Sequence, residues 1–237
     1  MKKILVKGPV LTRSGYGEQA RFALRALRSR PDLYDIYIEP INWGKTGWLF
    51  TNNEEKKWID SMIGKTSIYQ NSGGKFDVSL QVTIPNEWDN LATINVGYTA
   101  GIETTMVAPV WVEKGNAMDR IIVVSNHSKN SYESTSYTIS NSETREVINS
   151  GFRCETPIDV VGYPVRNIKP SEIDLNLDYD FNFLVVSQWG PRKNMENTIN
   201  WFLEEFKDEE VGLVLKTNIA KNSIIDREFT SKQIKEL

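Results

Sequence analysis

Two cations, Arg192 and Lys193, stand where a predicted strand gives way to a predicted helix. The strand is expected over Phe181–Val186 and the helix over Asn194–Phe206. Open α/β sheets bind their ligands beyond the carboxyl ends of the strands. An arginine can grip a phosphate through two parallel hydrogen bonds, and a lysine adds a point charge. The pattern therefore favours a phosphate or diphosphate site over its plain alternative, a solvated basic turn.

A third cation, Lys216, closes the next predicted strand, Val211–Leu215. Neighbouring parallel strands end at the same edge of a sheet, so Lys216 is expected near the first two cations. Three cations on one edge suit a diphosphate.

A glycine-rich segment near the amino terminus, Ser14-Gly15-Tyr16-Gly17, is the second candidate site. It follows a predicted strand, Lys3–Lys7, and precedes a predicted helix, Glu18–Arg28, whose Arg21 is expected on a polar face. We expect Gly17 to lie in a surface loop where a ligand can approach the backbone closely. The helix start would offer N–H groups to an anion, although a plain turn explains the same residues.

The same residues, Gly15 to Ala20, match the G-x-G-x-x-A fingerprint of dinucleotide-binding proteins. Glu39 also ends the following strand, where a ribose-binding acid would lie. In that fingerprint, however, the first glycine follows the strand closely, whereas here the segment from Gly8 to Gly15 is interposed. An NAD-dependent oxidoreductase is therefore the less favoured alternative.

Polar groups also follow the predicted strand Ala92–Gly97. Tyr98, Glu103 and Thr104 supply two hydroxyls and a carboxylate that could bind the hydroxyls of a sugar, although helix capping explains Glu103 and Thr104 equally well. His127 follows another predicted strand, and we expect it to cap a helix or lie on the surface rather than act in catalysis.

Alternating strands and helices predict an α/β fold built on a parallel, Rossmann-like sheet. The first domain is expected over residues 1–166, a linker over 167–180, and the opening βαβ part of a second Rossmann-like domain over 181–237. Within the first domain, Ser131–Thr144 is expected to be loop or helix end, and Arg145–Ser150 a short helix that ends at Gly151.

The composition excludes several classes of protein. The 237 residues carry 28 basic and 31 acidic side chains, a net charge of -3, which argues against a nucleic-acid partner. One cysteine and one histidine allow neither an internal disulfide nor an ordinary zinc site, so no metal is expected. No apolar run approaches the roughly 18 residues of a membrane span, and the expected location is the cytoplasm.

In their order along the chain, these motifs resemble the retaining GT-B glycosyltransferases of the large family 4 class. The loop at Ser14–Gly17 resembles their glycine-rich, donor-facing loop, and Asp119–Ser125 resembles their D-x-I-I-x-x-S stretch. Pro191–Asn194 resembles the P-R-K-G/N turn that opens their donor-binding domain. The resemblance covers almost the whole chain.

The resemblance implies transfer of a sugar from a nucleotide-diphosphate sugar to an unknown acceptor, with retention and without a metal or cofactor. It implies that Glu103 is catalytic, and that Tyr98 and Thr104 bind the acceptor. The residues that it implies for the donor are Ser14, Gly15, Tyr16, Gly17, Arg192, Lys193 and Lys216.

One motif of the family, E-x7-E, has no convincing counterpart. Glu228 and Glu236 have the spacing but lack the glycine-rich turn and apolar helix around it. We therefore expect a C-terminally truncated fragment that does not catalyse transfer alone. A non-catalytic GT-B-like binding or assembly subunit stays open as an alternative.

Overall fold

The computed structural model describes residues 1–237 and divides them into two compact units. The N-terminal unit comprises Met1–Trp43 and Leu49–Val165. The C-terminal unit comprises Gly44–Trp48 and Arg166–Leu237.

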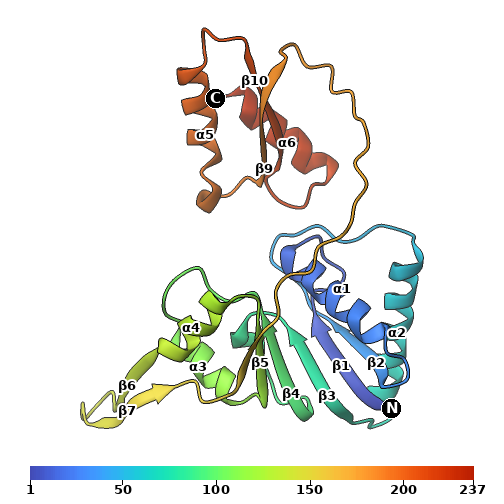
Figure 1. Cartoon of the computed structure of the whole chain (residues 1–237), viewed down its shortest axis with the longest axis vertical. Helices are drawn as coiled ribbons and strands as arrows, with labels where there is room; N and C mark the ends of the chain where they lie inside the picture. Colours follow the sequence, from blue (N-terminus) through green and yellow to red (C-terminus); the bar gives the residue numbers. More distant parts are fainter. The chain divides into compact units, whose positions relative to one another are not determined.

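The N-terminal unit is built on a six-stranded, wholly parallel sheet with the strand order β2-β1-β3-β4-β5-β8 (Figure 1). The predicted α/β class and parallel, Rossmann-like sheet are thereby confirmed. The chain builds outward from β1 first to β2 and then, in the other direction, to β3, so the strand order reverses at β1. Such a reversal is where open sheets form a ligand crevice beyond the strand carboxyl ends. The strands span β1 Lys2–Gly8, β2 Tyr34–Pro40, β3 Phe76–Val82, β4 Ala92–Thr99, β5 Arg120–Val123 and β8 Ile158–Val160.

Three apolar clusters hold helices against this sheet. In the first, Ile4 and Val6 of β1 meet Ala20 and Leu24 of α1. In the second, Ile121 of β5 meets Trp88, which follows η1, and side chains of α3 and α4. In the third, Leu5 of β1 packs with Tyr69 of α2. Alternate residues of a strand face opposite sides of a sheet, so one strand can serve two clusters. The helical elements are α1 Gly15–Arg28, α2 Glu54–Asn71, η1 Pro85–Glu87, α3 Pro109–Asn116 and α4 Asn126–Ser134.

Helix α2 also covers the edge strand β2. The Thr66 hydroxyl accepts a hydrogen bond from the Ile38 amide at 2.7 Å and donates to the Met62 carbonyl at 2.7 Å. Lys65 forms an ion pair with Asp35 close by. The Thr66 side chain of the helix thus forms a hydrogen bond with the backbone amide of Ile38, which could otherwise pair with another strand.

The segment after α4 differs from its prediction. Ser131–Thr144, predicted to be loop or helix end, does contain the end of α4 and a turn, but Ser136–Ser140 forms the strand β6. The short helix predicted at Arg145–Ser150 is wrong, because β7 Val147–Arg153 pairs with β6 in an antiparallel hairpin. The Asn141 side-chain oxygen stabilises the turn by accepting hydrogen bonds from the backbone amides of Glu143 and Thr144. Tyr137 and Phe152, a facing pair, attach the hairpin to the second apolar cluster.

The first strand of the C-terminal unit follows an extended segment without regular structure. Its strands β9 Phe181–Gln188 and β10 Val211–Asn218 are parallel neighbours. Phe183 of β9 contacts Phe202 of α5 and Phe206, the residue after that helix, at ring-centroid distances of 5.8 and 5.2 Å. The helical elements are η2 Pro191–Lys193, α5 Met195–Glu205 and α6 Ile224–Lys235, the last of which lies in a stretch for which no helix was predicted.

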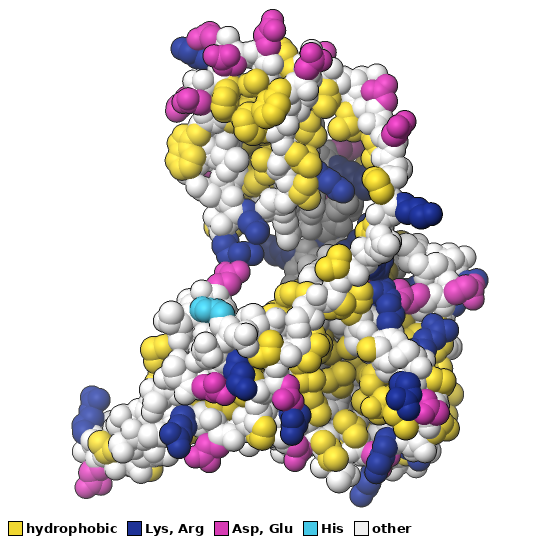
Figure 2. Space-filling model, viewed as in Figure 1, with side chains coloured by type: hydrophobic (Ala, Val, Ile, Leu, Met, Phe, Trp, Pro, Cys, Tyr) yellow, Lys and Arg dark blue, Asp and Glu magenta, His cyan; other side chains and the backbone are white.

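The other face of this small sheet is bare. Leu184 and Val186 alternate with the residues that face α5 and are 66% and 63% exposed. Hydrophobic side chains are also gathered on the visible surface of this unit (Figure 2). Its buried residues are Met195, Ile199, Asp226 and Thr230.

Local stability should therefore differ between the units. Few buried contacts allow local opening at low free energy. We expect the amides of β9 and β10 to exchange with solvent deuterium faster than those of β1, β3 and β4, as measured by mass spectrometry on the whole chain. Equal, strong protection of both sheets would contradict this expectation.

Candidate functional site

The buried guanidinium of Arg21 closes the loop between β1 and α1. Its Nη1 donates to the carbonyls of Val10 at 2.8 Å and Thr12 at 2.9 Å, and its Nη2 reaches Glu18 at 2.8 Å. The residue is only 5% exposed. Burial lowers the pKa of this guanidinium, and the Glu18 carboxylate opposes that shift. The loop therefore has a fixed shape, set by a residue that the sequence placed on a polar face.

Gly17 lies inside this arrangement rather than in a surface loop, so that prediction is wrong. Helix α1 begins at Gly15, with Ser14 as N-cap accepting the Gly17 amide at 3.0 Å. A Cβ on Gly17 would lie 2.8 Å from the Thr12 hydroxyl and 2.9 Å from the Pro9 carbonyl. A Cβ on Gly15 would meet nothing within 4 Å. Gly17 thus permits close approach of the chain's own loop.

This packing disfavours the dinucleotide alternative. In the fingerprint, the second glycine is open so that a pyrophosphate can approach the backbone. Here the loop residue Thr12 fills that space at Gly17. The hydroxyl of Thr12 is itself engaged, since it donates to the Pro9 carbonyl and lies 2.8 Å from the Ser14 hydroxyl.

Tyr16 links this loop to the end of β4. Its hydroxyl lies 2.8 Å from the Thr99 hydroxyl and accepts the Ala100 amide at 3.1 Å. Its ring lies against Trp43, with the centroids 4.5 Å apart. Burial raises the pKa of Tyr16. The side chain therefore presents a neutral hydroxyl and an aromatic surface at the carboxyl edge of the sheet.

Of the predicted acceptor residues, Tyr98 is buried and Thr104 is exposed. The Thr104 hydroxyl donates to the Met106 carbonyl at 2.9 Å, while its own carbonyl accepts from Ser131 at 3.1 Å. His127 also reaches that carbonyl, at 3.1 Å from Nε2, in line with the surface role expected for it. Glu103 lies exposed in the same loop.

In the C-terminal unit, Arg192 and Lys193 lie exposed in η2, the short turn that leads into α5. Asn194 follows them with φ 50° and ψ 42°, a left-handed conformation that asparagine and glycine adopt more readily than other residues. The Asn194 side chain does not cap the first-turn amides of α5. The turn therefore presents two cations beside an uncapped helix start.

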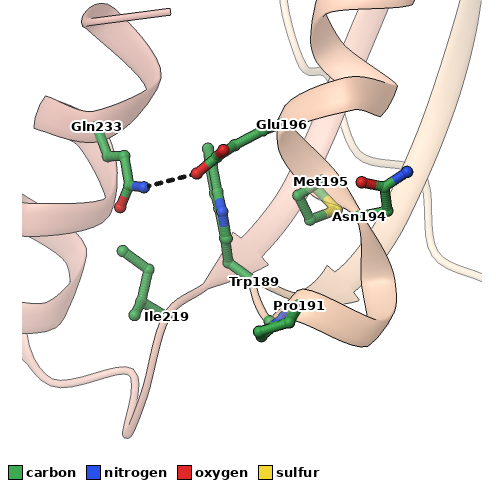
Figure 3. Close-up of a pocket in the computed structure, with 8 residues that line it drawn as sticks. Trp189, Pro191, Asn194, Met195, Glu196, Ile219 and Gln233 are labelled. Carbon is green, nitrogen blue, oxygen red and sulfur yellow. Dashed lines mark hydrogen bonds between the residues drawn. The ribbon is translucent and has the colours of Figure 1, made fainter.

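A pocket of about 350 Å³ adjoins this turn, at the carboxyl ends of β9 and β10. Figure 3 shows Glu196 of α5 and Gln233 of α6 facing each other across it, joined by a hydrogen bond of 3.3 Å. Trp189 and Ile219 supply apolar surface. The complete lining is Trp189, Gly190, Pro191, Asn194, Met195, Glu196, Ile219 and Gln233.

Lys216 lies apart from the η2 cations. It pairs in register with Val186, and aligned residues of parallel strands share one face of the sheet. Phe183 and the residues two positions away from it on β9 face α5, so Val186 and Lys216 lie on the opposite, uncovered face. The structure thus brings Arg192 and Lys193 together but places Lys216 on the other side of the sheet from α5.

Sequence reasoning missed several residues of these sites. Arg21 carried one signal, a glutamate three residues earlier on the helix, which suits an ion pair. Trp189 carried another, because it follows a strand directly at the ligand-binding edge. Glu196 and Gln233 come together only through the packing of α5 against α6, for which the sequence offers no local pattern.

No protein-family model, curated protein or solved structure matched this chain. No three His, Cys, Asp or Glu side chains come together in a way that could hold a metal ion. None of the helices combines the length and apolar character needed to cross a membrane.

The two glycines of α1 provide a matched test of the closed loop. Gly17→Ala should lower the free energy of unfolding by about 1–3 kcal/mol, because the added methyl group overpacks the contact with Thr12. Gly15→Ala should be neutral or stabilising by up to ~1 kcal/mol, since it has space and restricts the unfolded chain. Urea unfolding measures both. A Gly17→Ala variant as stable as the parent would show that the loop is not closed in solution.

Proposed function

We propose that this chain is a GT-B-type glycosyltransferase that uses a nucleoside-diphosphate sugar as donor. The order of motifs along the chain and the parallel α/β architecture of its N-terminal unit support the proposal. The proposed reaction transfers the sugar to an acceptor with retention at the anomeric carbon, as the resemblance implies.

The observation that carries the proposal is the cationic turn before α5. As the bond to the sugar breaks, the departing diphosphate gains negative charge. Arg192 and Lys193, with the uncapped amides at the start of α5, would stabilise that charge. Fixed charges and dipoles aimed at a developing charge lower the barrier most when they need no reorganisation. Asn194 fixes the turn through its left-handed backbone.

The adjoining pocket suits the nucleoside part of such a donor. Its volume of about 350 Å³ falls in the range of small-molecule sites, roughly 300–1,000 Å³. In the proposal, the Trp189 ring offers a planar surface for a base, while Glu196 and Gln233 offer hydrogen-bonding groups to its edge.

The N-terminal unit supplies the acceptor side of the proposal. Tyr98 and Thr104 bring hydroxyl groups to the end of β4 and the loop after it, and Glu103 is the proposed catalytic carboxylate. Tyr16, which the resemblance assigns to the donor, is proposed instead for the acceptor, because its hydroxyl meets that of Thr99 at the end of β4. Gly15, the first residue of α1, has open space around it, whereas Gly17 is buried.

Removal of both η2 cations tests the donor site. Arg192→Ala combined with Lys193→Ala should weaken UDP or GDP binding about 10- to 100-fold, because charge-assisted hydrogen bonds contribute roughly 1.5–3 kcal/mol each and an exposed turn is partly screened. Isothermal titration calorimetry on the whole chain gives the dissociation constants. The loss should shrink at high salt, since the contact is electrostatic.

The control is a double variant with the same change in charge. Lys207 follows α5, at the opposite end of that helix from the η2 turn, and Lys57 lies on α2 of the N-terminal unit; both are exposed. Lys207→Ala with Lys57→Ala should leave the dissociation constants unchanged. If both double variants bind the nucleotides as the parent does, the donor-site assignment fails.

A further inference from the structure

The side chain of Gln19 is buried without a hydrogen-bond partner. The residue is 2% exposed, and neither its Nε2 nor its Oε1 has a partner in the structure. Gln81 offers the contrast, because its buried amide donates to the Asp89 carbonyl at 2.6 Å and accepts the Asp89 amide at 2.9 Å. An unsatisfied buried amide destabilises a fold. The presence of glutamine at position 19 therefore needs an explanation other than hydrogen bonding within the fold.

Gln19 lies at the ligand edge of the N-terminal sheet. It stands three residues after Tyr16 on α1, and residues at that spacing share a helix face. Tyr16 reaches Thr99 at the end of β4, and Tyr98 precedes Thr99 on that strand. The Gln19 amide is near enough to the Tyr98 hydroxyl to lower its pKa against the larger effect of burial, but it does not have hydrogen-bond geometry.

The groups around Gln19 suit a neutral polyhydroxyl ligand. An amide offers two donors and an acceptor, and tyrosine hydroxyls both donate and accept, as sugar hydroxyls do. The ring pair of Tyr16 and Trp43 adds an apolar surface for the C–H face of a sugar ring. Burial raises the pKa of Tyr16 and the negative charge of Glu87 adds a smaller effect in the same direction, so the surroundings of this hydroxyl disfavour a phosphate.

We propose that the Gln19 amide, with the hydroxyls of Tyr16 and Tyr98, forms a subsite that binds the acceptor, and that this acceptor is a carbohydrate. The subsite lies at the start of α1, where the buried, unpartnered amide marks it out from an ordinary helix terminus. The role of the bound carbohydrate as an acceptor rests on the proposed glycosyl transfer. Carbohydrate binding itself can be measured without that activity.

The first measurement asks whether the Gln19 amide is part of the fold's own hydrogen bonding. Gln19→Leu keeps the size of the side chain and removes the unpartnered amide, so the melting temperature should stay the same or rise. Gln81→Leu, the buried and fully bonded counterpart, should lower it. A melting temperature that falls as far in Gln19→Leu as in Gln81→Leu would show that Gln19 is structural and would overturn the proposal.

The second measurement asks for the ligand. Saturation-transfer NMR on the whole chain, with methyl glycosides of glucose, galactose and mannose as probes, should detect binding of at least one sugar. Gln19→Leu should weaken that binding at least tenfold, whereas Gln70→Leu, at an exposed position of α2, should not. No saturable binding of any of the glycosides, or equal binding in Gln19→Leu, would overturn the subsite.

Calorimetry with UDP on the same proteins separates this inference from the proposed function. Gln19→Leu should bind UDP as the parent does. Sugar binding that depends on Gln19 in a chain that binds no nucleotide would uphold a carbohydrate subsite and reject the glycosyltransferase. Nucleotide binding without sugar binding would reject the subsite and leave the donor site standing.

Discussion

The closed β1–α1 loop depends on the buried guanidinium of Arg21. It ties two loop carbonyls to α1, so Thr12 comes to rest on Gly17 and Ser14 is in place to cap the helix. A buried guanidinium is tolerated only when its donors are satisfied, and here Glu18 and the carbonyls satisfy them. The glycine motif that resembles a phosphate cradle is therefore used mainly to fold the chain's own loop.

This constraint suggests a division of roles between the units. The N-terminal unit presents neutral hydroxyl and amide groups next to an aromatic pair, together with the carboxylate of Glu87. The C-terminal unit presents two cations and an uncapped helix start beside a pocket. A reaction that joins an anionic donor to a neutral acceptor needs both kinds of site, and this is the physical basis of the proposed glycosyl transfer.

The sequence predicted elements well where the pattern was local. The predicted first residues of three strands, Ala92, Phe181 and Val211, were correct, because the alternation of side chains in a strand is a short-range pattern. The β6–β7 hairpin was missed because Tyr137 and Phe152 gain their stability from a distant cluster. Helix α6 has no clear apolar stripe, yet Ser223 and Asp226 form a recognisable capping pattern at its start. The spacing of Glu18 and Arg21 suggested an ion pair, but the bonds of Arg21 to the loop carbonyls and the burial of the Gln19 amide follow only from the tertiary structure.

The central claim is that the α5 turn, and not the glycine-rich α1 turn, holds the diphosphate. Amide chemical-shift mapping by NMR during a titration of the whole chain with UDP tests it most directly. We expect the largest shifts on the backbone amides of Gly190 to Asn197, with those of Ser14 to Glu18 nearly unmoved. Largest shifts at Ser14 to Glu18, with the α5 turn unmoved, would contradict it.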